Sequence, residues 1–227
     1  GRGYENILFA MDYLTEQNKW NTGESTDRTH DITAKDKVVI VIGGGDTGSD
    51  CVGTARRQGA KQIHQLEILP KPPDSRAPET PWPLWPRMMR TSSSQEEGCE
   101  RQWSVSTRKF SGGAGIQVKQ LHGCQIEWIK KGKAWKPKEV PGTEFTLQAD
   151  LVLLALGFVH VVHDGLVRDL DIQLDDSGNV KTQNHQTSQP WVFAAGDAAF
   201  GASLVVRAIK SGRDAAAAID HWLAKNK

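Results

Sequence analysis

The chain has 227 residues, and its 28 Lys and Arg nearly balance its 27 Asp and Glu, so no general basic field attracts nucleic acid. No apolar run approaches the roughly 18 residues of a membrane helix, and we expect a cytoplasmic globular protein without a membrane partner. Its three cysteines, Cys51, Cys99 and Cys124, are widely spaced, which argues against a zinc site, an iron–sulfur cluster or a redox dithiol made by this chain alone.

The first predicted elements are a helix and a long polar segment. The run ILFAMDYL predicts a helix that begins near Ile7, and the polar residues 21–36 predict a linker or loop. The next apolar run, VVIVI at Val38–Ile42, does not alternate with polar residues. It predicts a strand that is buried on both faces, as in a parallel sheet.

Three glycines follow this strand in the pattern G-x-G-x-x-G, at Gly43, Gly45 and Gly48. A helix is expected directly after them and should run to about Gln58, with Gly59 just past its end. This strand, turn and helix are the context in which the pattern binds a dinucleotide. A glycine-rich turn that binds nothing is the alternative.

Each glycine has a distinct expected task. Gly43 takes the tight turn out of the strand, Gly45 lets a pyrophosphate approach the main chain, and Gly48 lets the helix pack closely on the strand. The helix N-terminus then offers unpaired N–H groups and a positive dipole end to phosphate oxygens. Asp46 or Thr47 is expected to cap this helix.

Residues 63–69, IHQLEIL, predict the second strand, and a proline-rich loop over residues 70–86 follows it. Glu67 lies 24 residues after Gly43, near the spacing at which a carboxylate binds the ribose 2′-OH of NAD. Lys71 and Arg76 in the loop offer positive charge to the 2′-phosphate of NADP. The sequence favours NADH, and the alternative for Glu67 is an ordinary solvent-facing strand residue.

The later residues predict a β-meander and then a return to the parallel sheet. Meander strands are expected near residues 116–121, 124–130 and 143–147, and LVLLALG at 151–157 predicts another buried strand. The glycines at 112, 113 and 115 precede a strand and predict a turn rather than a second phosphate loop. A helix at 164–170, a hairpin at 171–182, a strand at 191–197 and a helix at 203–224 complete the chain.

The segment VFAAGD and the helix after it resemble the carboxyl-terminal flavin motif of flavoproteins with two dinucleotide-binding domains. By this resemblance, Asp197 accepts a hydrogen bond from a ribityl hydroxyl of FAD, and the N–H groups near Ser203, Leu204 and Val205 face the flavin pyrimidine ring. An aspartate-capped surface turn before an alanine-rich helix is the alternative.

Several segments together resemble the carboxyl-terminal half of the glutamate synthase small subunit and the matching region of its single-chain NADH-dependent relatives. In chain order they are IGGGDTGSDCVGTARRQGA, QLEILPKPP, WPLWPRM, ADLVLLALGF, NVKT, VFAAGD and SLVVRAIKSGRDAA. The resemblance implies an α/β, Rossmann-like fold: a three-layer ββα nucleotide-binding domain with a β-meander, flanked by remnants of an FAD-binding domain. The expected divisions are residues 1–33 as FAD-domain remnant plus linker, 34–157 as the NAD(P)H-binding domain, and 158–227 as the carboxyl-terminal part of the FAD-binding domain.

The resemblance also implies an activity. A hydride passes from NAD(P)H to FAD, and electrons continue through iron–sulfur clusters to a large subunit that forms glutamate. Such proteins begin with cysteine-rich cluster-binding sequence and an FAD fingerprint of their own, which nothing before Val38 supplies. We therefore expect this chain to be a fragment whose FAD site is only partly present.

No catalytic residue and no metal ligand is expected, because the cofactors carry the chemistry. The expected cofactor-binding residues are Gly43, Gly44, Gly45, Asp46, Thr47, Gly48, Glu67, Lys71, Arg76, Gly157, Gly196, Asp197, Ser203, Leu204 and Val205. Two alternatives remain open. One is a related FAD and NAD(P)H reductase with another electron acceptor, and the other is a catalytically silent nucleotide-binding or docking module.

Overall fold

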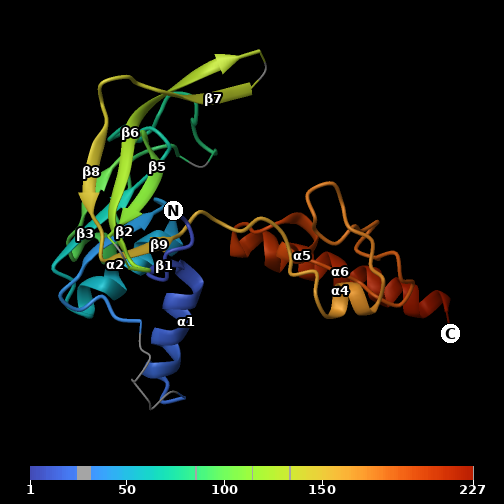
Figure 1. The fold of residues 1–227 in the computed structure, drawn as a ribbon. Helices are drawn as coiled ribbons and strands as arrows, with labels where there is room; N and C mark the ends of the chain where they lie inside the picture. The colour runs from blue at the N-terminus through green and yellow to red at the C-terminus, as the bar shows by residue number, and fades with distance from the viewer. Residues whose placement is uncertain (25–31, 85, 114, 133, 227) are drawn as a thin grey trace. The chain divides into compact units, whose positions relative to one another are not determined.

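The computed structural model describes residues 1–24, 32–84, 86–113, 115–132 and 134–226. It divides into two compact units, Gly1–Gly157 and Phe158–Lys227 (Figure 1). Residues 25–31 of the expected linker lie outside the described residues. Across the described segments, no helix is both long and apolar enough to cross a membrane.

The first unit is built on a parallel sheet of five strands. In spatial order these are β1 (Ile7–Phe9), β9 (Leu151–Leu154), β2 (Val38–Ile42), β3 (Gln62–Leu66) and β4 (Glu100–Gln102). Every neighbouring pair is parallel, so the carboxyl ends of all five strands lie at one edge. Because β2 pairs with β3 on one side and with β9 on the other, the strand order reverses at β2, where ligands of such sheets bind.

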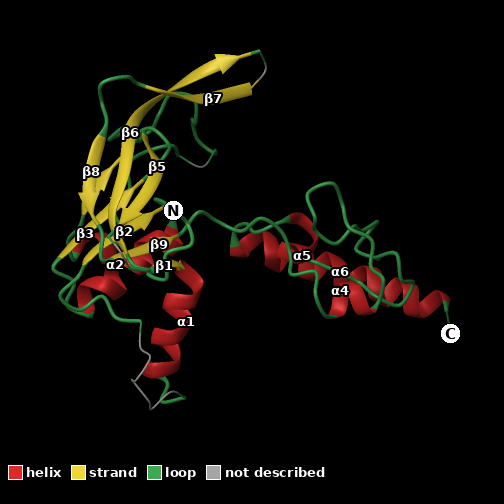
Figure 2. Ribbon diagram, viewed as in Figure 1, coloured by secondary structure: helices red, strands yellow, loops and turns green. Residues whose placement is uncertain are grey.

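The two faces of this sheet are covered differently. Val39 and Val41 pack with α1 (Ala10–Asn21) and α2 (Asp46–Arg57), whereas Ile40 packs toward the antiparallel strands. Successive strand residues point to opposite faces, so the unbroken VVIVI run fills both cores at once. Helices, parallel sheet and antiparallel strands therefore form three layers, and the expected ββα arrangement with a β-meander is confirmed (Figure 2).

The antiparallel layer consists of four strands. They are β5 (Val105–Gly112), β6 (Val118–Lys131), β7 (Ala134–Glu139) and β8 (Phe145–Gln148). Both β5 and β8 pair with the first half of β6, and β7 pairs with its second half. The short helix α3 (Ser93–Glu96) lies in the connection between β3 and β4. As expected, Gly112 ends β5 at a turn and opens no helix.

Three predicted elements of this unit have other bounds in the structure. The helix expected near Ile7 begins at Ala10, because Ile7–Phe9 pairs as a strand with β9. The strands expected at 116–121 and 124–130 form one continuous strand, β6. Gly123 does not break it, since a Cβ at this position would lie 2.6 Å from Cζ of Phe145, and the glycine makes room for that ring. Polar β5 and β7 were not predicted at all.

The described residues of the second unit form three helices and little regular sheet. They are α4 (Leu166–Asp169), α5 (Asp197–Phe200) and α6 (Val205–Lys225). The expected hairpin is reduced to a single bridge between Leu174 and Val180. The strand expected at 191–197 is also wrong: its backbone groups bond to the adjacent loop, for example Ala194 N–H to the His185 carbonyl, and Asp197 already begins α5.

Residues 1–33 were expected to be FAD-domain remnant plus linker. In the structure, β1 and α1 belong to the same compact unit as the Gly-rich turn, because β1 pairs along β9 and α1 packs on α2. The second unit begins at Phe158, next to the expected boundary at residue 157.

Candidate dinucleotide site

A cleft of about 630 Å³ opens where β2, β3 and β9 end. It is lined by Arg2, residues 42–47, 66–68 and 105–107, Phe110 and residues 154–157. The parallel strands thus contribute their carboxyl ends, and β5 of the antiparallel layer contributes a wall of apolar and hydroxyl side chains. This is the crevice position at which doubly wound sheets bind their ligands.

The glycines of the turn lack a side chain for different structural reasons. Gly43 has a φ of +127°, and a Cβ there would collide with the carbonyl oxygen of Ala155. A Cβ on Gly48 would collide with the carbonyl oxygen of Gly43 and lie 3.0 Å from Nε2 of Gln65. At Gly45, by contrast, no described heavy atom beyond the adjacent residues lies within 4 Å of a Cβ. Packing explains Gly43 and Gly48, whereas Gly45 leaves an open cradle over the main chain.

The expected side-chain cap of α2 is wrong. Gly45 is the N-cap residue, Asp46 is the first helical residue, and no side chain accepts a hydrogen bond from the helix end. The first N–H groups of a helix have no acceptor within the helix, so those of α2 stay available to a ligand in the cleft. The Gly-rich turn therefore presents backbone N–H donors to the cleft, and no described side chain caps them.

Glu67 lies at the end of β3, beside the Gly-rich turn. One oxygen of its carboxylate accepts the Gly44 N–H at 2.7 Å, and the other accepts the Leu69 N–H at 2.9 Å. A Cβ on Gly44 would collide with this carboxylate, so a side chain there would require Glu67 to move. Two backbone N–H groups therefore hold the Glu67 carboxylate beside the cleft.

Two expected phosphate-binding side chains lie outside the cleft. Lys71 pairs with Asp74 at 3.5 Å, and its Nζ lies 5.8 Å from the ring centroid of Trp103. Arg76 donates to the carbonyl oxygens of Thr80 and Leu84 at 3.0 and 3.2 Å. Its guanidinium group thus holds the proline-rich loop together. Neither residue lines the cleft.

A buried polar chain supports the turn from behind. Gln65, only 2% exposed, donates to the Gly43 carbonyl at 3.0 Å and accepts from Nε2 of Gln95 at 2.9 Å. Gln95 in turn completes a capping box with Ser92 at the start of α3. This chain ties the Gly-rich turn to the loop that follows β3.

The expected flavin-contacting residues gather in the second unit. Oδ1 of Asp197 accepts the Ser203 N–H at 3.2 Å, and Leu204 is the N-cap of α6 without a side-chain cap. Gly196 has a φ of +61° and donates its N–H to Ser211 Oγ at 2.9 Å. A hollow of about 260 Å³ is lined by Gly196, Phe200, Ser203, Arg207 and Ala208. The N-terminus of α6, with Val205, therefore lies next to Asp197.

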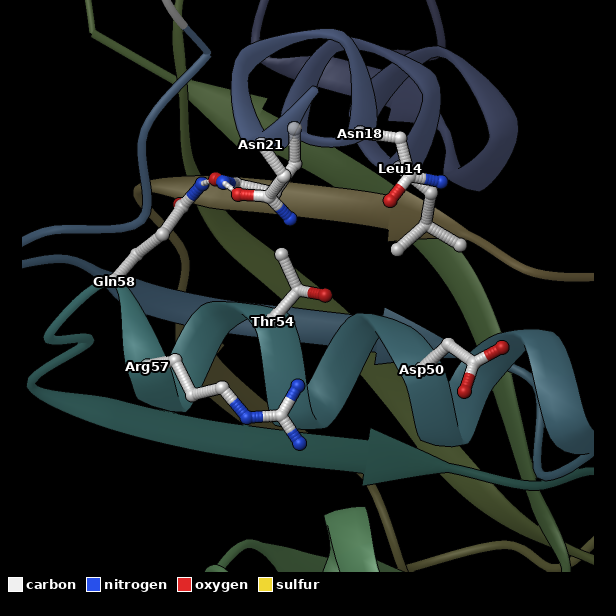
Figure 3. A pocket seen from close by; sticks show the side chains of 8 residues that line it. Leu14, Asn18, Asn21, Asp50, Thr54, Arg57 and Gln58 are labelled. Carbon is white, nitrogen blue, oxygen red and sulfur yellow. Dashed lines mark hydrogen bonds between the residues drawn. The ribbon is translucent and has the colours of Figure 1, made fainter. Parts of the chain in front are cut away.

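A second hollow of the first unit, about 380 Å³, lies between α1 and α2 and is lined mainly by polar residues (Figure 3). Its amides satisfy one another: Gln17 donates to Asn21 at 2.7 Å and Gln58 donates to Gln17 at 2.6 Å. It has no Gly-rich turn. Within the described segments, no three His, Cys, Asp or Glu side chains gather closely enough to hold a metal ion.

Sequence reasoning missed the part of the cleft that comes from distant elements. Arg2, Phe110 and the start of β5 line it beside the Gly-rich turn. Their positions depend on the pairing of β1 with β9 and on the packing of β5 over the sheet, which no local motif reports. Gly157, with a φ of +87°, lines the cleft as expected.

The parallel sheet, the switch point at β2 and the open Gly-rich turn define a Rossmann-like dinucleotide-binding unit. In agreement, the model of the family described as pyridine nucleotide-disulphide oxidoreductase matches residues 2–212. The chain belongs to this family.

Two relatives illustrate the similarity. The small chain of a glutamate synthase [NADPH] from Mycobacterium tuberculosis is 47% identical over 98% of this chain and 46% of its own length. A glutamate synthase [NADH] from Schizosaccharomyces pombe is 40% identical over 96% of this chain and 11% of its own length. The chain thus spans about half the length of the bacterial relative. Its resemblance to the glutamate synthase small chain is confirmed.

A solved structure shows the same fold at low sequence identity. FprA from Mycobacterium tuberculosis, in complex with NADPH, has a TM-score of 0.69 and is 13% identical. The match covers 99% of this chain and 60% of FprA. The Rossmann-like oxidoreductase fold expected from the sequence is therefore confirmed.

Proposed function

We propose that this chain is the NAD(P)H-binding part of a glutamate-synthase-type oxidoreductase. In that enzyme a hydride passes from NAD(P)H to FAD, and electrons continue through iron–sulfur carriers to the large subunit or domain that forms glutamate. The similarity to glutamate synthase small chains supports the enzyme class and the large-subunit partner. The three cysteines are free, which fits a cytoplasmic protein.

The observation that carries the nucleotide assignment is the open cradle at Gly45. No neighbouring side chain or backbone segment of the described fold occupies the space beside Gly45. This space lies at the N-terminus of α2 and is open to a ligand. The pyrophosphate of NAD(P)H fits this place, because it brings negative charge to unpaired N–H groups. Gly43, Gly44 and Gly48 shape the turn, and Asp46 and Thr47 contribute the first helical N–H groups.

We assign the ribose of the adenosine half to Glu67. Its carboxylate is fixed beside the turn, can accept a hydrogen bond from a ribose 2′-OH, and repels a 2′-phosphate. Lys71 and Arg76 are engaged elsewhere and lie outside the cleft, so they do not offset this repulsion. This supports the expectation of NADH as the preferred cofactor.

When bound, FAD supplies the electron-accepting chemistry. For this chain we propose that Asp197 accepts a hydrogen bond from FAD and that the N-terminus of α6, at Ser203 to Val205, faces negative charge on the flavin. The uncapped helix start and its closeness to Asp197 support both roles. The first unit holds and orients NAD(P)H, and positioning rather than proton transfer is its contribution to rate.

Titration with NADH and NADPH of the chain, of Gly45→Val and of a matched control tests the assignment. The φ of Gly45 is −78°, so valine is compatible with the backbone and the variant should fold. Its side chain fills the cradle, and we expect affinity to fall at least about tenfold, as for the loss of a charge-assisted hydrogen bond. Gly113→Val, also at a position with open space, should bind as the wild type does.

The outcomes separate the parts of the proposal. Unchanged affinity in a folded Gly45→Val would remove the phosphate-loop assignment. Tighter binding of NADPH than of NADH by the wild type would overturn the assignment of Glu67 to a free 2′-OH. Nucleotide binding without any electron transfer in the complete protein would instead favour a silent nucleotide-binding module.

A further inference from the structure

The guanidinium group of Arg2 is held at the carboxyl edge of the parallel sheet. Although Arg2 precedes β1 in the chain, its Nη1 donates to the Ile7 carbonyl at 2.9 Å, and its Cζ lies 4.9 Å from the ring centroid of Phe9. The side chain therefore reaches along β1 to the end of the strand. Guanidinium has five N–H donors in a planar fork, and within the described part of the chain one of them donates to a protein acceptor.

Arg2 also has a particular electrostatic place in the cleft. Among the residues that line it, Asp46 and Glu67 are acidic and Arg2 is the one Lys or Arg. It forms no ion pair with any described carboxylate, so its charge is not neutralised within the described fold. A ligand with two negative charges is repelled by the two carboxylates of this cleft. The positive charge of Arg2 can offset this repulsion.

The strand order decides which part of a dinucleotide Arg2 faces. The Gly-rich turn follows β2, Glu67 follows β3 on one side, and β9 and then β1 lie on the other side. With the adenosine ribose at Glu67 and the pyrophosphate over the turn, the other half of the molecule extends toward β9 and β1. Arg2 lies on that side of the turn.

We propose that Arg2 binds the nicotinamide-side phosphate of NAD(P)H and so fixes the direction in which the nicotinamide half leaves the Gly-rich turn. This inference rests on the proposed function and assigns the site one further ligand-binding residue. The fork geometry of guanidinium suits two phosphate oxygens, whereas a lysine offers only a point charge.

Binding of three nucleotides to the 227-residue chain tests the role. NADH is titrated directly by its fluorescence, and ADP-ribose and AMP are measured by displacement of NADH. ADP-ribose contains both phosphates, whereas AMP lacks the nicotinamide-side phosphate. For Arg2→Gln we expect NADH and ADP-ribose to bind about tenfold or more weakly, and AMP to bind as tightly as to the wild type. Arg2→Lys should recover part of the loss.

Arg57→Gln serves as the control. It removes the same charge from the same unit, but Arg57 pairs with Glu97 and lies outside the cleft. Circular dichroism and thermal unfolding check that each variant is folded. All three ligands should bind this control with wild-type affinity.

Each outcome decides between distinct explanations. Equal loss for AMP and NADH in Arg2→Gln would show a general disturbance of the turn and overturn the inference, as would unchanged NADH binding in a folded variant. If the wild type binds neither NADH nor NADPH, the proposed function itself fails and the inference fails with it. If the wild type binds NADH and Arg2→Gln binds it equally tightly, the role of Arg2 is wrong but the proposed function stands.

Discussion

At the scale of single residues, His64 should make the stability of the fold depend on pH. It is 5% exposed, and its Nδ1 lies 3.2 Å from Oε2 of Glu100 on the neighbouring strand. Burial, which outweighs the opposing charge of Glu100, lowers the pKa of His64 below its usual 6.5. The unfolded chain therefore binds this proton at higher pH than the native chain does. The native state loses stability as pH falls through 6.5 toward the lowered native pKa.

Urea unfolding between about pH 7.5 and 5.5 measures this effect. The free energy of unfolding should fall more steeply with decreasing pH in the wild type than in His64→Gln, since glutamine cannot take up the proton. His221→Gln, which replaces an exposed histidine on α6, should keep the wild-type dependence. Parallel curves for the wild type and His64→Gln would contradict the assignment.

Single residues also show what the sequence can and cannot reveal about the site. Gly43, Gly45 and Gly48 were recognisable because the strand, turn and helix that position them are contiguous. Glu67 was found by spacing and does lie at the turn. Lys71 and Arg76 were expected to offer positive charge to a 2′-phosphate, but local partners in their own loop hold them. Arg2 could not be predicted because its place at the cleft depends on the pairing of β1 with β9. The paired residues Ile7 and Val152 are 145 positions apart in the sequence.

At the scale of elements, the turn depends on the strand and the loop behind it. Gln65 of β3 bonds to both the Gly43 carbonyl and Gln95 of α3. In Gln65→Met, side-chain size is nearly kept but both partners lose a buried hydrogen bond. We expect the free energy of unfolding to fall by about 1–3 kcal/mol. NADH affinity should fall as well, because the Gly-rich turn is no longer held.

Gln62→Met is the matched control for this prediction. It lies on the same strand, but it is exposed, and its side chain donates to the exposed carboxylate of Glu100. Its effect on unfolding in urea should stay within about 0.5 kcal/mol. If Gln65→Met were no more destabilising than Gln62→Met, the buried chain would not be supporting the turn.

Elements whose own residues form a clear pattern were predictable, and elements that depend on their partners were not. The unbroken apolar runs of β2 and β9 and the long helix α6 each contain enough residues of one kind to specify their structure. The exposed strand β7 has no buried residue to form a pattern, and its strand geometry comes from pairing with β6. VFAAGD looks like a strand, but in the described residues Phe193 forms only an isolated antiparallel bridge with Gln186, so the segment does not extend into a regular strand.

At the scale of the whole molecule, the two units hold different halves of the proposed chemistry. The first has the Gly-rich turn and the cleft, and the second has Asp197 and the N-terminus of α6. The sequence contains one G-x-G-x-x-G pattern, and the proposal assigns it to NAD(P)H. FAD also carries a pyrophosphate, for which the second unit offers no comparable glycine turn in its described residues.

We therefore expect the purified 227-residue chain to bind NADH but to retain no flavin. A visible absorption spectrum, recorded before and after addition of FAD and then NADH, provides the measurement. Absence of a retained flavin band, together with NADH binding measured separately, would agree with a nucleotide-holding unit whose FAD site needs further residues.

Asp197→Ala should then leave NADH affinity unchanged, because Asp197 lies in the other unit. A flavin band that survives gel filtration and is bleached by NADH would instead mean that these 227 residues complete the flavin site. The assignment of FAD to a partial site would then be wrong, while the nucleotide site at Gly45 would stand.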